Sequence, residues 1–470
     1  MDKEAPTVLD SAAESTTAPK LKRELRVGDL TLFAIACIVS TRWLPIAAHA
    51  GPGSVTLWLL AAVFFVVPLT VSVAALVAKY PEAGGLYLWA RRDFGAWHGF
   101  ICFWVYWVGI AFLFPTATLL YAKVAFSLLG PSYSHLGENR YYLLAVALTL
   151  MWVGLGANIF GLKAGKWAEN LGALATSAVG LLLVVVARMV WARRGIATPM
   201  HIVPKWDWGT VSFWAAIAYA TSGMEGAGMM AGEICDPERT MRRAGWAAAA
   251  FAAVYYATAT VALLIVLPPE RISEMNGFAE IADSAGLLLG VAWLSPLLAI
   301  LVLASGVGLI GGIGTASSRM PFVAGVDRLL PKAFGKVHPR WRTPHISILA
   351  LGMAATFLLI AYQLGDTMRA AFDELVSLMV LTGFLPFLYI FASAWKAGKR
   401  LSAISGLAVT VLALVSSVVP PGEITNVWLF EGKLAAGTVA VVVSAWLVYR
   451  RRKIIMKPSP LPPSLGVSDR

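Results

Sequence analysis

The fold expected of this chain is decided by the stretch Ser40-Thr41-Arg42-Trp43-Leu44-Pro45, which interrupts the apolar run 28–50. A second stretch, Thr221-Ser222-Gly223-Met224-Glu225-Gly226, interrupts the apolar run 210–233 in the same way. Each run is long enough to cross a bilayer, for which about 20 apolar residues are needed. Inside a membrane, an unwound stretch persists only where it lines a cavity or is buried in protein. Both stretches therefore predict membrane helices that are broken beside an internal cavity.

The composition places the rest of the chain in a membrane as well. Of its 470 residues, 58% are apolar and 14% are charged, whereas soluble domains average about 45–50% and about 25%. This balance argues against a water-soluble enzyme. Three cysteines (Cys37, Cys102 and Cys235) are too few for a disulfide-rich secreted fold. Residues 1–26 are polar and carry no signal-peptide pattern, so we expect the first apolar run to be retained.

Apolar runs recur along the whole sequence and predict an all-α membrane protein with about twelve transmembrane helices. The run 286–318 exceeds the thickness of a bilayer, so we expect it to tilt or to extend into the cytosol. In chain order the runs are 28–50, 55–78, 98–127, 141–160, 167–191, 210–233, 244–267, 286–318, 345–362, 373–395, 402–419 and 433–449.

Basic residues are distributed unevenly between the loops on the two sides of these helices. The side that carries both termini has 26 Lys and Arg residues in its loops, and the opposite side has 8. Cytoplasmic loops carry such an excess, so both termini are predicted to be cytosolic in an inner cell membrane. The net charge of +12 is then the positive-inside bias, and we expect a lipid bilayer and no nucleic acid as partner.

The two broken helices open the two halves of the chain. Interrupted helices at corresponding positions of two halves are typical of a transporter site built from inverted repeats. We therefore expect two five-helix repeats followed by two further helices. The predicted parts are an N-terminal tail at 1–26, a first repeat at 27–191, a second repeat at 210–395, two helices at 402–449 and a C-terminal tail at 450–470.

Three motifs in the predicted cytosolic loops resemble the amino acid–polyamine–organocation permease family. The first is Tyr80-Pro81-Glu82-Ala83-Gly84-Gly85-Leu86-Tyr87-Leu88-Trp89, followed by Phe94-Gly95, after the second helix. The second is Gly223-Met224-Glu225 followed by Ala231-Gly232-Glu233-Ile234-Cys235-Asp236-Pro237. The third is Ser318-Arg319, Asp327-Arg328-Leu329-Leu330-Pro331 and Thr343-Pro344 after the eighth helix. The resemblance implies a five-plus-five inverted-repeat (LeuT-like) core with two extra helices, and transport of amino acids or amines by exchange or proton coupling.

Two positions depart from the pattern of many family members. The first helix reads Ser40-Thr41-Arg42-Trp43 where many members have a glycine-rich break, so the substrate pocket should differ. Some sodium-independent members have a lysine in the fifth helix, and that position falls on Thr176 or Ser177 here. The Arg42-Trp43 pair is similar to bacterial glutamate/GABA-exchanger-like permeases. The Ala231-Gly232-Glu233-Ile234 exit motif is also similar to polyamine permeases of the plant type.

Candidate site residues come from the two breaks. We expect substrate to be bound by Ser40, Thr41, Arg42, Ser222, Gly223 and Glu225, gating by Tyr219 and Trp43, and coupling by Glu225 and Thr176. Of these roles, the gating role of Tyr219 and the coupling position Thr176 are implied by the resemblance. Four aromatic residues of the third helix are weighed as packing residues or as substrate contacts: Trp104, Tyr106, Trp107 and Tyr121.

Arg42 and Glu225 are expected to share one polar cavity, because each charge alone would be costly in the membrane interior. A guanidinium stays charged at physiological pH, so Arg42 would bind a substrate carboxylate or replace a coupling cation, and Glu225 would be the titratable partner. A static ion pair without a role in transport is the alternative. The pair favours zwitterionic or acidic substrates over purely cationic ones.

Other polar residues give weaker indications. The histidines show no metal-ligand spacing, and we expect neither a metal nor a cofactor. Lys123 lies near the outer end of its helix and is expected to snorkel. Glu169 and Glu233 lie near predicted cytosolic helix ends, where we expect them to pair with basic loop residues.

The function that these features predict is secondary active transport of a zwitterionic or acidic amino acid by alternating access, with exchange or coupling to H+. An amine or polyamine permease of the same fold is the alternative within the class. A nutrient sensor without turnover is a second alternative, and a membrane enzyme is a third, although the sequence shows no convergent catalytic residues. The oligomeric state stays open.

Overall fold

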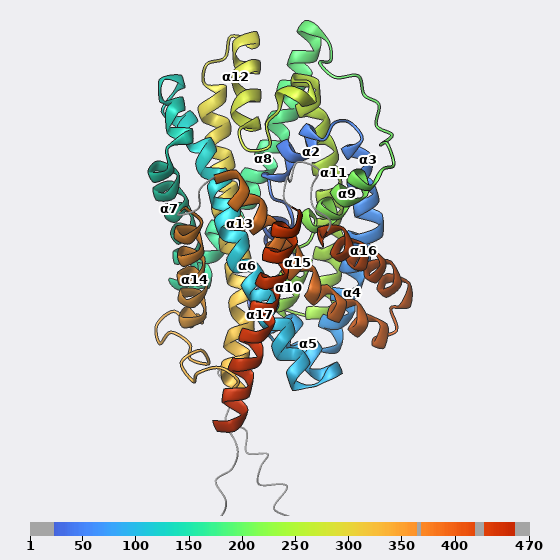
Figure 1. Ribbon diagram of the computed structural model, residues 1–470, viewed down its shortest axis with the longest axis vertical. Helices are drawn as coiled ribbons and strands as arrows, with labels where there is room; N and C mark the ends of the chain where they lie inside the picture. The colour runs from blue at the N-terminus through green and yellow to red at the C-terminus, as the bar shows by residue number, and fades with distance from the viewer. Residues whose placement is uncertain (1–22, 364–367, 419–426, 456–470) are drawn as a thin grey trace, which may run out of the picture.

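The computed structural model describes residues 23–363, 368–418 and 427–455 and is almost entirely helical there (Figure 1). The α-helices are α1 (Val27–Ile38), α2 (Trp43–His49), α3 (Ser54–Ala61), α4 (Val67–Lys79), α5 (Gly85–Phe94), α6 (Ala96–Ala125), α7 (Arg140–Ile159), α8 (Leu162–Arg194), α9 (Trp208–Ala220), α10 (Met224–Met229), α11 (Pro237–Val266), α12 (Gly277–Leu289), α13 (Leu294–Val326), α14 (His345–Gln363), α15 (Met368–Lys396), α16 (Arg400–Val418) and α17 (Val427–Ile455). Short 3₁₀ or π segments are η2 (Ala62–Val66), η3 (Phe126–Leu128), η4 (Pro131–Glu138), η5 (Ala231–Glu233) and η6 (Pro269–Arg271).

Eleven of the twelve predicted apolar runs overlap one helix or a series of consecutive helical segments, the run 286–318 being the exception because the chain reverses within it, and the all-α membrane architecture is confirmed. Within the described ranges, eight helices are long and apolar enough to cross a membrane, and the bent pair α1–α2 makes a ninth. The runs 210–233 and 345–362 form the shorter helices α9, α10 and α14.

The predicted run 286–318 is shifted in the structure. Residues 277–289 form the separate helix α12, and the long helix α13 begins only at Leu294. The chain reverses between them at Gly290, whose φ of +72° is a left-handed conformation that glycine adopts without a steric cost. The sequence is apolar on both sides of this turn, so hydropathy alone does not reveal the turn.

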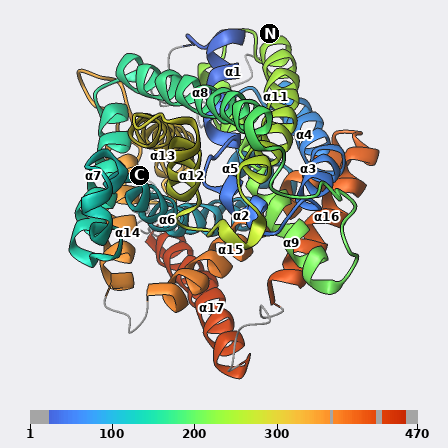
Figure 2. The same cartoon turned by 90° about the horizontal axis from the view of Figure 1, so that it is seen from above.

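Two long helices form much of the interior of the bundle. α13 packs against α8, α6 and α7, and α6 also packs against α15. Seen along the bundle, α7, α14, α16 and α17 lie at the rim (Figure 2). The most apolar stretch of α6 is 72% buried in protein and that of α17 is 17% buried, so α17 leaves most of its surface for lipid.

Two of the sequence motifs meet at the end of the bundle that holds α5 (Figure 1). The Tyr87 hydroxyl donates a hydrogen bond to Asp327 at 2.5 Å, and Arg91 forms an ion pair with the same carboxylate. These contacts tie α5 to the end of α13, so the loop after α4 and the stretch after α13 form one structural unit.

Asp93 lies at the C-terminal end of α5, a helix that is not among the membrane-spanning ones, and its contacts fix that end. Burial raises the pKa of Asp93, but hydrogen bonds from Tyr80 and Lys79 outweigh that effect and hold the pKa below its usual range. Asp93 therefore stays charged and keeps its ion pair with Lys79.

Candidate substrate site between two broken helices

The first break separates α1 from α2, whose axes differ by 48°. Helix α1 ends at Ile38, and Val39 adopts an extended conformation with φ −95° and ψ 105°. Ser40, Thr41 and Arg42 follow with 5%, 0% and 4% of their surfaces exposed. Unwound backbone with buried polar side chains is tolerated at this depth because it faces other protein groups rather than lipid.

The second break lies between α9 and α10 and depends on Gly223. Its φ of +128° belongs to the region that side chains disfavour. A Cβ atom at this position would lie 2.6 Å from the carbonyl oxygen of Cys37. Glycine is therefore required on two counts, and the close approach places the start of α10 against the end of α1.

Tyr256 of α11 joins the two breaks. Its hydroxyl accepts a hydrogen bond from the Ser40 backbone N–H at 2.9 Å. The same hydroxyl lies within donating distance of two carbonyl oxygens, at 3.1 Å from Ile38 and at 3.2 Å from Ala220. The ring stacks on Trp58 with centroids 4.0 Å apart. One side chain thus satisfies backbone groups that both broken helices leave free.

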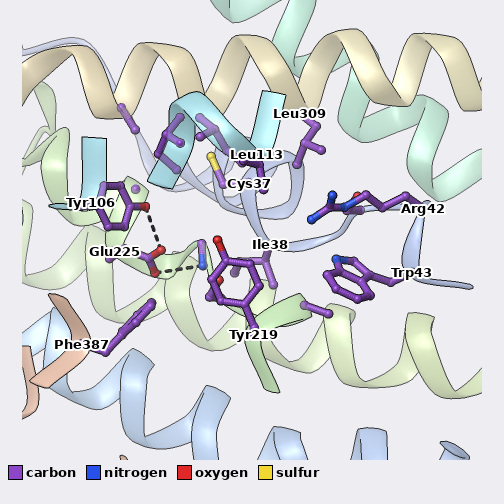
Figure 3. A pocket seen from close by; sticks show the side chains of 18 residues that line it. Cys37, Ile38, Arg42, Trp43, Tyr106, Leu113, Tyr219, Glu225, Leu309 and Phe387 are labelled. Atoms are coloured by element: carbon purple, nitrogen blue, oxygen red, sulfur yellow. Dashed lines mark hydrogen bonds between the residues drawn. The ribbon is translucent and has the colours of Figure 1, made fainter. Parts of the chain in front are cut away.

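A cavity of about 40 Å³ lies between the breaks. Figure 3 shows Tyr106 and Glu225 on one side of the view, Arg42 and Trp43 on the other, and Tyr219 between them. Residues from the breaks and from the neighbouring helices line it: Cys37, Ile38, Ser40, Arg42, Trp43, Tyr106, Ile110, Leu113, Tyr219, Ala220, Ser222, Gly223, Glu225, Gly226, Leu309, Ile313, Ala316 and Phe387.

The Glu225 end of the cavity is a carboxylate held by two donors. The Tyr106 hydroxyl donates to Oε1 at 3.0 Å, and the Gly223 backbone N–H donates to Oε2 at 2.9 Å. Glu225 is 2% exposed. A carboxylate accepts several hydrogen bonds, so its remaining lone pairs can receive a ligand ammonium.

The Arg42 end of the cavity is a guanidinium with weak partners. One terminal nitrogen donates to Thr116 Oγ1 at 3.3 Å, and the other lies 3.8 Å from the Met379 sulfur. The charge also lies 4.8 Å from the centre of the Trp43 ring, while Nε has no hydrogen-bond partner. Five donors with so few acceptors leave Arg42 able to bind an anionic group.

Arg42 and Glu225 share the cavity as the sequence predicts, but the structure joins these two described residues by no ion pair. Their partners are Thr116 and Met379 on one side, and Tyr106 and Gly223 on the other. The structure therefore does not contain the static Arg42–Glu225 ion pair that was the alternative.

The predicted site residues divide into two groups in the structure. Seven of them line the cavity: Ser40, Arg42, Trp43, Tyr219, Ser222, Gly223 and Glu225. Thr41 and Thr176 are not among the lining residues. Thr176 instead forms a 2.7 Å hydrogen bond with Ser305 of α13 and donates to the Gly172 carbonyl. Their roles in substrate binding and coupling stay predictions.

Several cavity residues were outside the predicted set. Cys37, Leu309 and Phe387 are ordinary apolar positions in the sequence, and only the fold brings them to the cavity. Tyr256, which joins the two breaks without lining the cavity, is also beyond sequence reasoning, because no local pattern marks it as the partner of a helix break. Tyr106 was weighed among four aromatic residues, and its contact with Glu225 distinguishes it from the others.

The remaining expectations have mixed outcomes. Glu233 forms an ion pair with a basic residue as expected, but this residue, Arg319, lies within α13 rather than in a loop. The expected pairing of Glu169 with a basic loop residue is wrong, since its hydrogen-bond partner is the Thr315 hydroxyl at 2.9 Å. Lys123 pairs with Glu138 at 3.2 Å.

Two broken helices that face each other across a buried polar cavity, in an all-helical membrane bundle, define a secondary transporter of the LeuT-like inverted-repeat class. The chain belongs to the amino acid permease family, whose family model matches residues 26–419. The resemblance to amino acid–polyamine–organocation permeases is thereby confirmed.

Similar proteins from several bacteria are transporters by name. An uncharacterised transporter of Legionella pneumophila is 27% identical over 92% of this chain and 97% of its own length. The low-affinity putrescine importer PlaP of Escherichia coli is 26% identical over 66% of this chain and 67% of its own. The glutamate/serine transporter AimA of Bacillus subtilis is 23% identical over 78% of this chain and 70% of its own length.

A solved structure supports the fold independently. The crystal structure of MhsT in complex with L-phenylalanine superposes with a TM-score of 0.62 at 13% identity, covering 87% of this chain and all of that one. At this identity the similarity concerns the fold alone.

Proposed function

We propose that this protein transports an amino acid with a free carboxylate and an ammonium group across the inner cell membrane, with both termini in the cytosol. The transported molecule is zwitterionic or acidic, and its passage is coupled to H+ or to exchange. The molecule leaves the protein chemically unchanged.

The observation that carries this proposal is the arrangement of the two cavity charges. Arg42 and Glu225 line the same cavity from different helix breaks, and each keeps unused hydrogen-bonding capacity. A ligand with one negative and one positive group satisfies both charges, whereas a diamine leaves Arg42 opposed by a like charge. The apolar residues Ile110, Leu113 and Phe387 then surround the carbon skeleton.

Binding would proceed from opposite ends of the cavity. Arg42 receives the carboxylate, and Glu225 together with the freed backbone carbonyls of the breaks receives the ammonium. Tyr219, which lies between the two charges in Figure 3, covers the ligand and excludes water, so both charged contacts become stronger. The Trp43 ring lies beside the Arg42 guanidinium and covers the Arg42 end of the cavity.

A polyamine permease of the same fold is the second candidate. The named similarity to a putrescine importer favours it, and Glu225 supplies a site for one ammonium group. Arg42 is the feature that opposes it, because a fixed cation in the same cavity repels a diamine.

Counterflow in proteoliposomes tests the proposal. Vesicles containing the purified full-length protein are loaded with unlabelled glutamate, serine, GABA, phenylalanine or putrescine and then given the labelled form of each. We expect counterflow of at least one amino acid and none of putrescine. Counterflow of putrescine alone would favour the amine permease, and ligand-induced thermal stabilisation without any counterflow would favour a sensor.

A further inference from the structure

Glu169 of α8 is a buried acid that the proposed binding site does not use. Its side chain is 5% exposed and receives one hydrogen bond, from the Thr315 hydroxyl of α13 at 2.9 Å. Within the described residues it forms no ion pair. A charged carboxylate in a membrane interior with a single neutral donor is costly, and protonation removes that cost.

The other two buried acids of this region have stronger partners. Glu225 accepts hydrogen bonds from Tyr106 and from the Gly223 backbone. Glu233 receives two hydrogen bonds from the Arg319 guanidinium, at 2.8 Å and 3.1 Å. Glu169 is therefore the acid whose negative charge has the least support from its surroundings.

A pair of glycines in α13 lies next to both Glu169 and a residue of the central cavity. On α13, a Cβ atom at Gly311 would lie 3.8 Å from Glu169 Cγ, and one at the next residue, Gly312, would lie 3.1 Å from the Cys37 sulfur. Cys37 itself lines the cavity beside Glu225. Two consecutive glycines of α13 thus border Glu169 on one side and the cavity residue Cys37 on the other.

Thr315 connects Glu169 to the ion pair between Arg319 and Glu233. The Thr315 backbone carbonyl accepts a hydrogen bond from Arg319 at 2.8 Å while its hydroxyl donates to Glu169. Arg319 forms an ion pair with Glu233. The backbone carbonyl of Glu233 accepts hydrogen bonds from the backbone N–H groups of Glu24 at 2.9 Å and Leu25 at 3.0 Å. The segment before α1 is therefore fastened to η5 beside the Glu233–Arg319 ion pair.

We infer that Glu169 is a second proton-binding residue of this transporter, between the central cavity and the Glu233–Arg319 ion pair. The inference rests on the proton coupling proposed above. When Glu169 is protonated, Arg319 stays with Glu233 and the segment before α1 stays fastened. When the proton leaves, the Glu169 carboxylate competes for Arg319, one helical turn beyond Thr315, and weakens the Glu233 contact. Proton release and opening of this end of the site are thereby linked.

The groups around Glu169 allow this competition. Arg319 of α13 is the basic side chain next to Thr315, and Glu233 of η5 is its present partner. The Cys37 thiol of α1 and the neutral Asn158 amide of α7 border the same glycine pair. Lys166, one turn away on α8, forms an ion pair with Asp29 at 2.5 Å, so among the described side chains Arg319 is the cation for which Glu169 can compete.

The substitution Glu169→Gln tests the inference because the amide keeps the shape and cannot release a proton. In proteoliposomes we expect E169Q to retain counterflow of the transported amino acid and to lose accumulation driven by an imposed pH gradient. The matched control is Glu238→Gln at an exposed position of α11, which should accumulate substrate as the wild type does. Equal accumulation by E169Q and wild type would overturn the assignment of Glu169.

Infrared difference spectroscopy on the purified protein gives a readout that does not depend on transport. Titration with pH should show a protonated carboxyl C=O band that is absent in E169Q. In Thr315→Val, which loses the hydrogen bond to Glu169, the same band should shift, so the assignment survives if E169Q does not fold. A titrating band unchanged in both variants would refute the inference. Wild-type protein that exchanges substrate without any proton-driven accumulation would overturn the proposed proton coupling and this inference together.

Discussion

The Tyr256 hydroxyl accepts a hydrogen bond from the backbone N–H of Ser40 at 2.9 Å, and through this contact α11 holds the break of the first membrane helix. The same oxygen faces the carbonyl of Ala220 at the end of α9. A position 216 residues away in sequence therefore fixes the backbone that forms the candidate site.

Replacing Tyr256 with Phe should destabilise the protein by about 1–3 kcal/mol, because a buried N–H and two carbonyls lose their partner. Thermal unfolding in detergent, followed by tryptophan fluorescence, measures the effect, and substrate affinity should fall as well. The neighbouring Tyr255 is a matched control, since its buried hydroxyl has no hydrogen-bond partner. Tyr255→Phe should leave stability unchanged, and equal losses in both variants would contradict the role given to Tyr256.

Replacing Arg42 with Gln should weaken binding of carboxylate substrates about 10- to 100-fold, which corresponds to one charge-assisted hydrogen bond of about 1.5–3 kcal/mol. Glu225→Gln should weaken binding of the ammonium group and change the pH dependence of uptake. Scintillation proximity binding and uptake at several pH values measure these effects. Wild-type affinity in R42Q for every carboxylate substrate, with an unchanged pH profile in E225Q, would remove the support for the proposed mechanism.

Removing the ring of Tyr219 should weaken substrate binding about tenfold while the fold remains intact. Tyr219→Phe should bind nearly as the wild type does, because the covering ring remains. Gly383→Ala of α15 tests the same position indirectly, since its Cβ would lie 2.3 Å from the Tyr219 ring and displace it. Unchanged affinity in both Y219A and G383A would show that another aromatic residue covers the ligand.

The predicted orientation places the loops 79–97, 234–243 and 319–343 in the cytosol. In a background without native cysteines, single cysteines at the exposed positions Glu82, Glu238 and Lys336 should resist an impermeant thiol reagent in intact cells. Glu274→Cys, in the exposed loop between α11 and α12, should react under the same conditions. Labelling of K336C from outside would reverse the orientation.

Much of the architecture could be predicted from local sequence. Hydropathy located the helices, because a spanning segment must be apolar along its whole length. Glycine, proline and a full charge inside apolar runs located both breaks at Ser40–Arg42 and at Ser222–Gly223. The start of α13 was missed because the turn at Gly290 lies between two apolar stretches and changes hydropathy little.

Local sequence also selected most of the cavity residues, but it could not assign their partners. It paired Glu169 with a basic loop residue, and the fold instead gives it Thr315, 146 positions away. It placed Arg42 and Glu225 in one cavity, and the fold gives each of them other contacts. Which donor reaches which carboxylate depends on the relative rotation of packed helices, and no periodic pattern in one helix encodes that rotation.

The sequence by itself determined that this chain is a multi-pass membrane protein with two interrupted helices, since backbone satisfaction in lipid permits few alternatives. Its motifs also identified the permease family. Only the tertiary structure decided that Tyr106 holds Glu225, that Tyr256 joins both breaks, and that Glu169 has one neutral partner. These contacts join side chains on different helices, which meet only when the helices pack. They determine which partners surround each of the charged groups on which the proposed transport depends.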